Sequence, residues 1–147
     1  MPLIKIISTG GTIANTSQGL ISIDEVLKDI PQARAMADFE IAEATRVRSG
    51  QMRLAQWFDV ARAASAAAED LRVDGIIVTH GTFTTEETAY FLHLVVRTEK
   101  PIVVVASQRK HDEVGNDGDR NPYRPTYRGH LDRIAHDQAS NAACRSS

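Results

Sequence analysis

Apolar runs rich in β-branched residues alternate with segments of helical periodicity along most of this chain. Residues 3–7, 76–78 and 102–105 form three such runs, each with the length and composition of a buried strand. Between the first two, residues 54–71 repeat apolar side chains at helical spacing. Buried strands that alternate with helices predict a mostly parallel sheet with helices on both faces. We therefore expect an α/β fold with Rossmann-like or flavodoxin-like layering.

Weaker patterns predict the elements between the first two runs. Residues 39–47 alternate apolar and polar side chains, which indicates a half-exposed strand. The polar stretch 15–19 contains a glycine and predicts a loop. Ser22 and Glu25 have capping-box spacing, which predicts a short helix that Pro31 closes.

Two longer helices are expected to cover the sheet. The segment 54–71 carries many alanines, which permit close packing against strands. Thr84 and Glu87 again have capping-box spacing, so a helix is expected to begin there and to run to Val95.

Length and composition limit the classes of protein to consider. The 147 residues suffice for one hydrophobic core, so we expect one α/β domain over residues 1–121. Residues 122–147 are rich in arginine and proline and lack periodicity, which predicts an irregular tail and favours disorder. A formal net charge of −2 gives no support to nucleic acid or an anionic membrane as a partner. With no signal-peptide pattern, no spanning apolar run and a single cysteine, Cys144, a cytoplasmic protein is expected.

Hydroxyl and amide side chains follow three of the predicted strands. Two glycines and Thr12 follow the first strand, Thr82 follows the third, and Ser107 with Gln108 follows the fourth. The carboxyl ends of parallel strands meet at one edge of a sheet, which is where α/β proteins bind ligands. The first stretch is equally consistent with a tight strand exit or with a Thr12 nucleophile surrounded by main-chain N–H groups.

Other polar residues have simpler explanations. His80 at a strand end is more often a structural hydrogen-bonding residue than a catalytic one. The adjacent residues 111–113, His-Asp-Glu, rarely converge on one ion without a distant ligand, so no metal is expected. Glu86 and Glu87 open a helix, where carboxylates meet the positive end of its dipole. No phosphate-binding glycine motif is present, and we expect no cofactor.

Two stretches of the chain resemble the signature motifs of the bacterial L-asparaginase family. They are Thr9-Gly10-Gly11-Thr12-Ile13-Ala14 and Thr79-His80-Gly81-Thr82-Phe83-Thr84-Thr85-Glu86-Glu87-Thr88-Ala89, in the family's order and separation. Ser49 with Gln51 resembles the family's short substrate-binding stretch, and Asn116-Asp117-Gly118 resembles the region after its fourth strand. The resemblance covers residues 3–120.

The resemblance implies a threonine amidohydrolase that converts L-asparagine to L-aspartate and ammonia. By this resemblance, Thr12 is the nucleophile and Thr82 is the second active-site threonine, which positions a water or relays a proton. Ser49 holds the α-carboxylate of the substrate, and Gln51 holds its α-amino group. A threonine hydroxyl needs a base or a proton-relay partner to attack.

Two further implications concern the oxyanion and the assembly. Main-chain N–H groups beside Gly11 and Thr82 supply donors to the tetrahedral oxyanion. The partner is a small-molecule amide substrate, with no cofactor, and the family's subunits assemble, so a homo-oligomer is expected. Apolar sheet edges left without a cover favour the same outcome.

The sequence departs from the family pattern at three points. Phe83, in the substrate pocket, stands where the family has an aspartate that binds the substrate ammonium and orients a catalytic lysine. That lysine has no counterpart here, and the family's smaller C-terminal domain is absent from this sequence. Two hypotheses follow: an asparaginase-like enzyme with an altered pocket at Phe83, or a catalytically inactive truncated relative or small-molecule binding module that keeps the fold.

Overall fold

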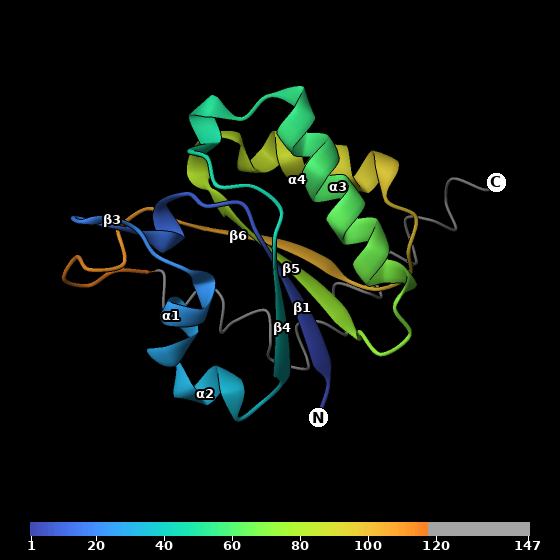
Figure 1. The fold of residues 1–147 in the computed structure, drawn as a ribbon, viewed down its shortest axis with the longest axis horizontal. Coiled ribbons are helices and arrows are strands. Elements are labelled where there is room, and N and C mark those ends of the chain that lie inside the picture. The colour runs from blue at the N-terminus through green and yellow to red at the C-terminus, as the bar shows by residue number, and fades with distance from the viewer. Residues whose placement is uncertain (118–147) are drawn as a thin grey trace.

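Four parallel strands form the central sheet of the computed structural model, which describes residues 1–117 (Figure 1). The spatial order is β4 (Asp38–Glu43), β1 (Leu3–Ser8), β5 (Gly75–Gly81) and β6 (Ile102–Ser107). The predicted α/β class with a parallel sheet is thereby confirmed, and the strand order is the flavodoxin-like one. The predicted domain boundary at residue 121 and the tail 122–147 lie outside the described residues.

The register places the apolar run of β1 at the centre of the sheet. Ile6 lies between Ile41 of β4 and Ile77 of β5, and the whole of β5 is buried. β4 forms one edge of this sheet and is only partly buried, as its alternating pattern predicted. It ends at Glu43, several residues before the predicted end.

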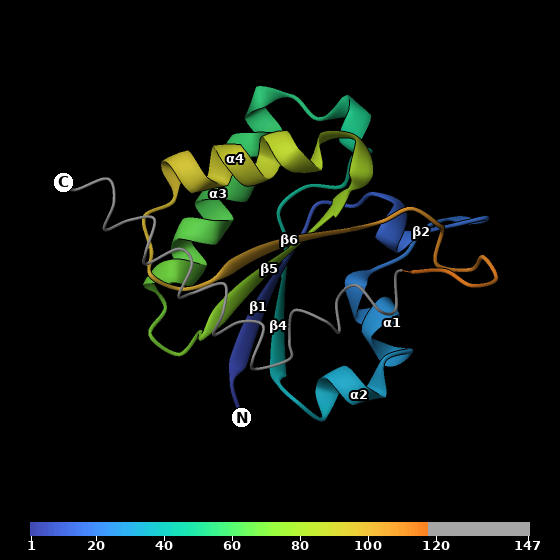
Figure 2. The ribbon, with the colours of Figure 1, turned by 180° about the vertical axis from the view of Figure 1, so that it is seen from behind.

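Helices cover both faces of the sheet, as predicted (Figures 1 and 2). The short helices α1 (Ile23–Lys28) and α2 (Pro31–Arg34) lie on one face, and α3 (Leu54–Glu69) and α4 (Thr85–Val95) lie on the other. Two apolar cores result. The first contains Ile4, Ile6, Val26, Leu27 and Ile77, and the second contains Ile7, Val60, Ala64, Val78 and Leu92.

Side chains of β1 alternate between these cores because successive residues of a strand point to opposite faces. The alanines of α3 pack on the sheet as expected. Leu54, Phe58 and Leu71 of the predicted apolar face are instead exposed. None of the helices within residues 1–117 is long and apolar enough to cross a membrane.

The structure confirms one of the local predictions for residues 15–31 and corrects two others. The predicted loop 15–19 contains a small antiparallel hairpin of β2 (Asn15–Thr16) and β3 (Gly19–Leu20). The capping box of Ser22 and Glu25 is confirmed. Pro31 follows α1 but also begins α2, because proline suits the first turn of a helix.

The second predicted capping box does not form. Thr84 precedes α4 but makes no side-chain cap, and its hydroxyl instead donates to the Ser49 carbonyl at 3.0 Å. Glu86 and Glu87 do occupy the first turn of the helix, as expected.

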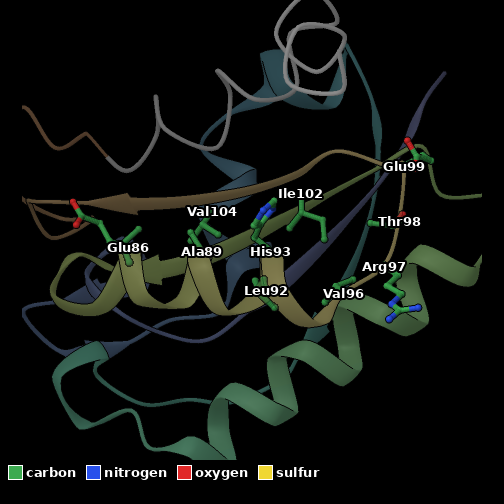
Figure 3. A pocket seen from close by; sticks show the side chains of 11 residues that line it. Glu86, Ala89, Leu92, His93, Val96, Arg97, Thr98, Glu99, Ile102 and Val104 are labelled. Atoms are coloured by element: carbon green, nitrogen blue, oxygen red, sulfur yellow. The ribbon is translucent and has the colours of Figure 1, made fainter. Parts of the chain in front are cut away.

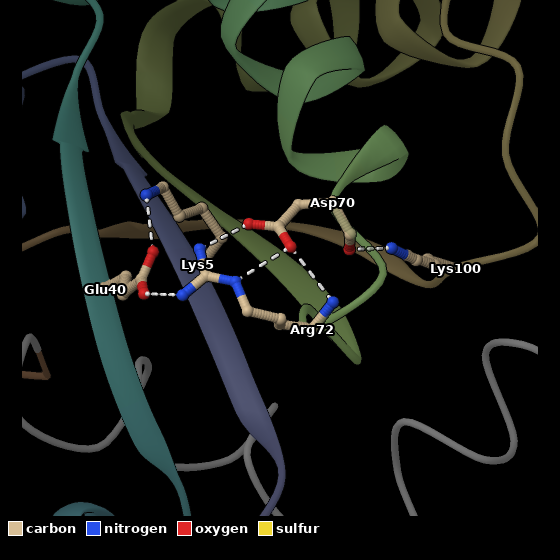
Figure 4. A network of polar contacts seen from close by, with 5 residues as sticks. All are labelled: Lys5, Glu40, Asp70, Arg72 and Lys100. Carbon is tan, nitrogen blue, oxygen red and sulfur yellow. Dashed lines mark hydrogen bonds and ion pairs between the residues drawn. The ribbon is translucent and has the colours of Figure 1, made fainter.

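An ion-pair network joins strands β1 and β4 to the turn after α3 (Figure 4). Lys5 Nζ donates to Glu40 at 3.0 Å, and Arg72 pairs with both Glu40 and Asp70, at 3.2 and 2.7 Å. The hydrogen bond from Lys5 lowers the pKa of Glu40, and the hydrogen bonds from Arg72 lower the pKa of Asp70. Lys100 donates to the backbone carbonyl of Asp70.

Replacing Arg72 by alanine is expected to flatten the acid side of the stability profile. Asp70, whose pKa is lowered chiefly by the hydrogen bonds from Arg72, contributes stability that is present above its unfolded pKa of 3.8. That contribution is lost as pH falls through the lowered pKa. Urea unfolding from neutral pH to about pH 3 measures the loss. Arg97→Ala, which removes an exposed arginine outside the network, is the control and should retain the wild-type profile. An unchanged profile in Arg72→Ala would contradict the prediction.

Candidate active site

Two strand exits meet at the carboxyl edge of the sheet through their backbones. Gly10 and Gly11, which follow Thr9 after the end of β1, have φ values of 89° and 85°, which residues other than glycine rarely adopt. A Cβ on Gly11 would lie 2.5 Å from the backbone nitrogen of Gly81, the last residue of β5. The turn that carries Thr12 is therefore in direct contact with the turn that carries Thr82.

Ser49 completes this contact from a third segment. It begins the 3-10 helix η2 (Ser49–Gln51), is buried, and lies so close to Gly81 that a Cβ there would collide with its side-chain oxygen. The backbone N–H of Phe83 donates to Ser49 Oγ at 3.2 Å. The Thr84 hydroxyl donates to the Ser49 carbonyl at 3.0 Å. Two hydrogen bonds, one to the side chain and one to the carbonyl of Ser49, therefore join η2 to η3 (Thr82–Thr84).

The predicted site residues differ in how closely they approach one another. Gly11, Ser49 and Gly81 are in direct contact, and Phe83 joins them through its backbone. Thr12 begins the 3-10 helix η1 (Thr12–Ala14) and is half-buried, and Thr82 begins η3 and is exposed.

Two of the predicted residues lie toward solvent. Phe83 is 79% exposed, and a Cβ added at Gly50 would lie at van der Waals distance from its ring. Gln51 is exposed, with its backbone N–H donating to the Arg48 carbonyl at 2.8 Å. Thr84 was missed as a part of the site. Its signal was present in the sequence, because a threonine hydroxyl at a turn can bind any nearby carbonyl as well as cap a helix.

Comparison with known proteins identifies the family. The N-terminal asparaginase domain family matches residues 3–127 of the chain. The chain belongs to the asparaginase family. The residues matched include every predicted site residue and the strands that carry them.

Individual asparaginases agree with this assignment. A probable periplasmic L-asparaginase of Haemophilus influenzae is 37% identical over 132 residues, and a glutaminase-asparaginase of Acinetobacter glutaminasificans is 35% identical over 130 residues. These alignments cover 84% and 82% of this chain but only 37% and 39% of the relatives. The chain therefore spans little more than a third of their length.

A solved asparaginase has the same fold. The crystal structure of a probable cytoplasmic L-asparaginase from Campylobacter jejuni superimposes with a TM-score of 0.78 at 36% identity, covering 86% of this chain and 41% of that one. The relatives' names include both a periplasmic and a cytoplasmic location, so the cytoplasmic location of this chain stays a prediction.

His80 lies in β5, directly before Gly81, and is fully buried. Its Nδ1 is 2.7 Å from the Gly81 carbonyl, and its Nε2 is 2.9 Å from the Thr88 hydroxyl. Burial lowers the pKa of the ring, an effect that the hydrogen bond to Gly81 and the charge of Glu87 oppose. The structural role favoured by the sequence fits these contacts.

The residues that end and follow β6 form hydrogen bonds with one another. The Ser107 hydroxyl donates to the Arg109 carbonyl at 3.0 Å, and the Asp117 carboxylate accepts the backbone N–H groups of Gln108 and Arg109. The loop that follows contacts the N-terminal part of the chain. His111 Nε2 lies 2.8 Å from Asp29, and Asp112 accepts from Ser17.

These contacts give His111 and Asp112 structural roles in joining the loop to the N-terminal part of the chain. Within residues 1–117, no three histidine, cysteine or carboxylate side chains converge as a metal site would require.

A groove of about 470 Å³ lies beside α4 (Figure 3). It lies between α4 and β6, and its lining includes Glu86, His93, Arg97, Ile102 and Val104. None of the predicted catalytic or binding residues lines it. The predicted site residues lie instead at the carboxyl ends of β1 and β5, in and beside η1, η2 and η3.

Proposed function

We propose that this chain is an asparaginase-like amidohydrolase that hydrolyses L-asparagine to L-aspartate and ammonia with Thr12 as nucleophile. One observation carries the proposal. The glycine before Thr12 touches the glycine before Thr82, and Ser49 packs on the latter, so three separate segments converge at one sheet edge. This convergence occurs in a chain of the asparaginase family, over the residues that the family match covers.

The reaction follows from the chemistry of a hydroxyl nucleophile. Thr12 Oγ attacks the side-chain amide carbon. Its proton passes to Thr82 or to a water, which acts as the base or proton relay. The C–N bond of the tetrahedral intermediate then breaks, and the nitrogen leaves as ammonia after taking up a proton. Water attacks the resulting ester, which releases aspartate and restores the threonine. The backbone N–H groups of Gly11 and Gly81 are the proposed donors to the oxyanion.

Substrate binding is assigned to the η2 segment. Ser49 Oγ already accepts the N–H of Phe83, so its own hydrogen remains free to donate to the α-carboxylate of the substrate. Gln51, exposed at the end of the same helix, offers a side-chain oxygen to the α-ammonium group. Both assignments are proposals that extend the family resemblance.

A second candidate function is an inactive relative or a small-molecule binding module that retains this fold. Two observations favour it. The ring of Phe83 is apolar and exposed where a charged acceptor would bind an ammonium group. Within residues 1–117, the Thr12 hydroxyl has no hydrogen-bonded histidine, lysine or carboxylate to take its proton, and His80 is buried with both ring nitrogens engaged.

The variant Phe83→Asp separates the two functions. Its carboxylate can pair with the substrate ammonium, so we expect kcat/KM for L-asparagine to rise about tenfold, which corresponds to about 1.4 kcal/mol. Ammonia release by the full chain is the measurement. Phe83→Asn has nearly the same shape without the charge and should give a much smaller increase.

L-Glutamine serves as the comparison substrate, because the Acinetobacter relative is named as a glutaminase-asparaginase. If neither the wild type nor Phe83→Asp releases ammonia from either amide, the proposed enzymatic function is wrong. The inactive or binding alternative would then stand.

A further inference from the structure

The imidazole of His80 connects three elements that surround the candidate site. His80 itself belongs to β5, and its Nδ1 lies 2.7 Å from the Gly81 carbonyl at the end of that strand. Its Nε2 lies 2.9 Å from the Thr88 hydroxyl in α4 and 2.9 Å from the sulfur of Met52, the residue after η2. One side chain therefore contacts β5, α4 and the end of η2.

The partners of the ring determine which nitrogen carries the proton. The Gly81 carbonyl can only accept, so Nδ1 must donate to it. A neutral ring then has a bare Nε2, which accepts the hydrogen of the Thr88 hydroxyl. His80 and Thr88 are both completely buried, so water does not compete for these bonds.

The Gly81 carbonyl is also held by a second donor. The Thr85 hydroxyl, in the first turn of α4, donates to it at 2.7 Å. Together the two donors fix the direction of the peptide between Gly81 and Thr82. Because Gly81 is packed against the backbone of Gly11 and the side chain of Ser49 with no room for a Cβ, a small rotation of this peptide would disturb both contacts.

We propose that His80 is a positioning residue, whose hydrogen bonds to Gly81 and Thr88 hold the Thr82 turn in the place that the active site requires. The inference rests on the proposed amidase function for its catalytic consequence, and it assigns to His80 no contact with substrate. A histidine that merely filled the core would affect stability, whereas a positioning residue also determines the geometry of the turn and the rate of the chemical step.

Two pairs of variants in the full chain test the proposal. His80→Asn keeps a donor near the position of Nδ1 but removes the contact with Thr88, and His80→Gln places its amide near the position of Nε2 and loses the bond to Gly81. Thr88→Val removes the hydroxyl at nearly constant volume, and Thr88→Ser retains it. The Thr88 pair keeps the test valid if a His80 variant does not fold.

The first readout is independent of activity. Backbone amide chemical shifts of Thr82 and Phe83 report the turn, and those of Val26 in α1 and Glu40 in β4 serve as distant references. We expect Thr88→Val and His80→Gln to move the turn resonances while the reference resonances stay in place. Thr88→Ser should resemble the wild type, and His80→Asn should retain more of the turn geometry than His80→Gln.

The second readout is the kinetics of ammonia release. We expect kcat to fall about tenfold to a hundredfold in Thr88→Val, with a smaller change in KM, and to recover in Thr88→Ser. Unmoved turn resonances in Thr88→Val and His80→Gln would overturn the proposal, as would equal shifts at the turn and at the references. If the wild type releases no ammonia, the proposed function fails, but the amide shifts still decide whether His80 positions the turn.

Discussion

Replacing Thr12 by alanine is expected to lower ammonia release from L-asparagine by at least about 1,000-fold. Without the hydroxyl no covalent ester can form, and removing a nucleophile from other hydrolases costs three to six orders of magnitude. The fold should remain, because Thr12 is only half-buried and its hydroxyl bonds to no other side chain within residues 1–117. Far-UV circular dichroism and the urea midpoint check that point.

Thr12→Ser is the matched variant, because it retains the hydroxyl and loses only a methyl group. It should retain activity well above that of Thr12→Ala. Equal ammonia release by wild type and Thr12→Ala would show that this hydroxyl is not the nucleophile. A mock preparation from host cells that lack the protein, purified through the same steps, measures the ammonia released by host amidases, and this background is subtracted from both rates.

Gly11→Ala is expected to destabilise the protein by about 3 kcal/mol or more and to abolish ammonia release. The added Cβ would lie 2.5 Å from the backbone nitrogen of Gly81, where no flexible side chain can move aside. Forcing alanine to a φ of 85° adds about 1–2 kcal/mol, and overpacking typically adds another 1–3 kcal/mol. Urea denaturation gives the free energy of unfolding.

Gly19→Ala separates the two causes. Gly19 also has a positive φ, of 129°, but a Cβ there would meet nothing within 4 Å. The stability lost in Gly19→Ala should therefore reflect backbone strain alone. This variant should leave ammonia release unchanged, because Gly19 lies in the β2–β3 hairpin. If Gly11→Ala and Gly19→Ala lose equal free energy of unfolding, the collision with Gly81 does not destabilise the protein. The close contact of the two turns is then not needed for stability.

The sheet was predictable because its strands are marked by continuous apolar runs. Residues 3–7 and 76–78 are too apolar to lie at a surface, and they pair in the structure as neighbouring buried strands. The contact between Gly11 and Gly81 was not predictable from spacing alone. The strand order determines it, and the sequence pattern leaves that order open.

The local errors have a common physical cause. Thr84 has the spacing of a helix cap, yet its hydroxyl binds the Ser49 carbonyl, which lies 35 residues earlier in the chain. Pro31 is equally compatible with the end of one helix and the beginning of the next. In both cases the local pattern allows two structures, and tertiary contacts select one of them.

The central position of β1 has a consequence for synthesis on the ribosome. β1 is made before both of its neighbours in the sheet: Ile6 waits for Ile41 on one side and for Ile77 on the other. Until then its apolar side chains and its hydrogen-bonding groups have no native partner. From its synthesis until β5 has been made, this segment is therefore exposed and prone to aggregation.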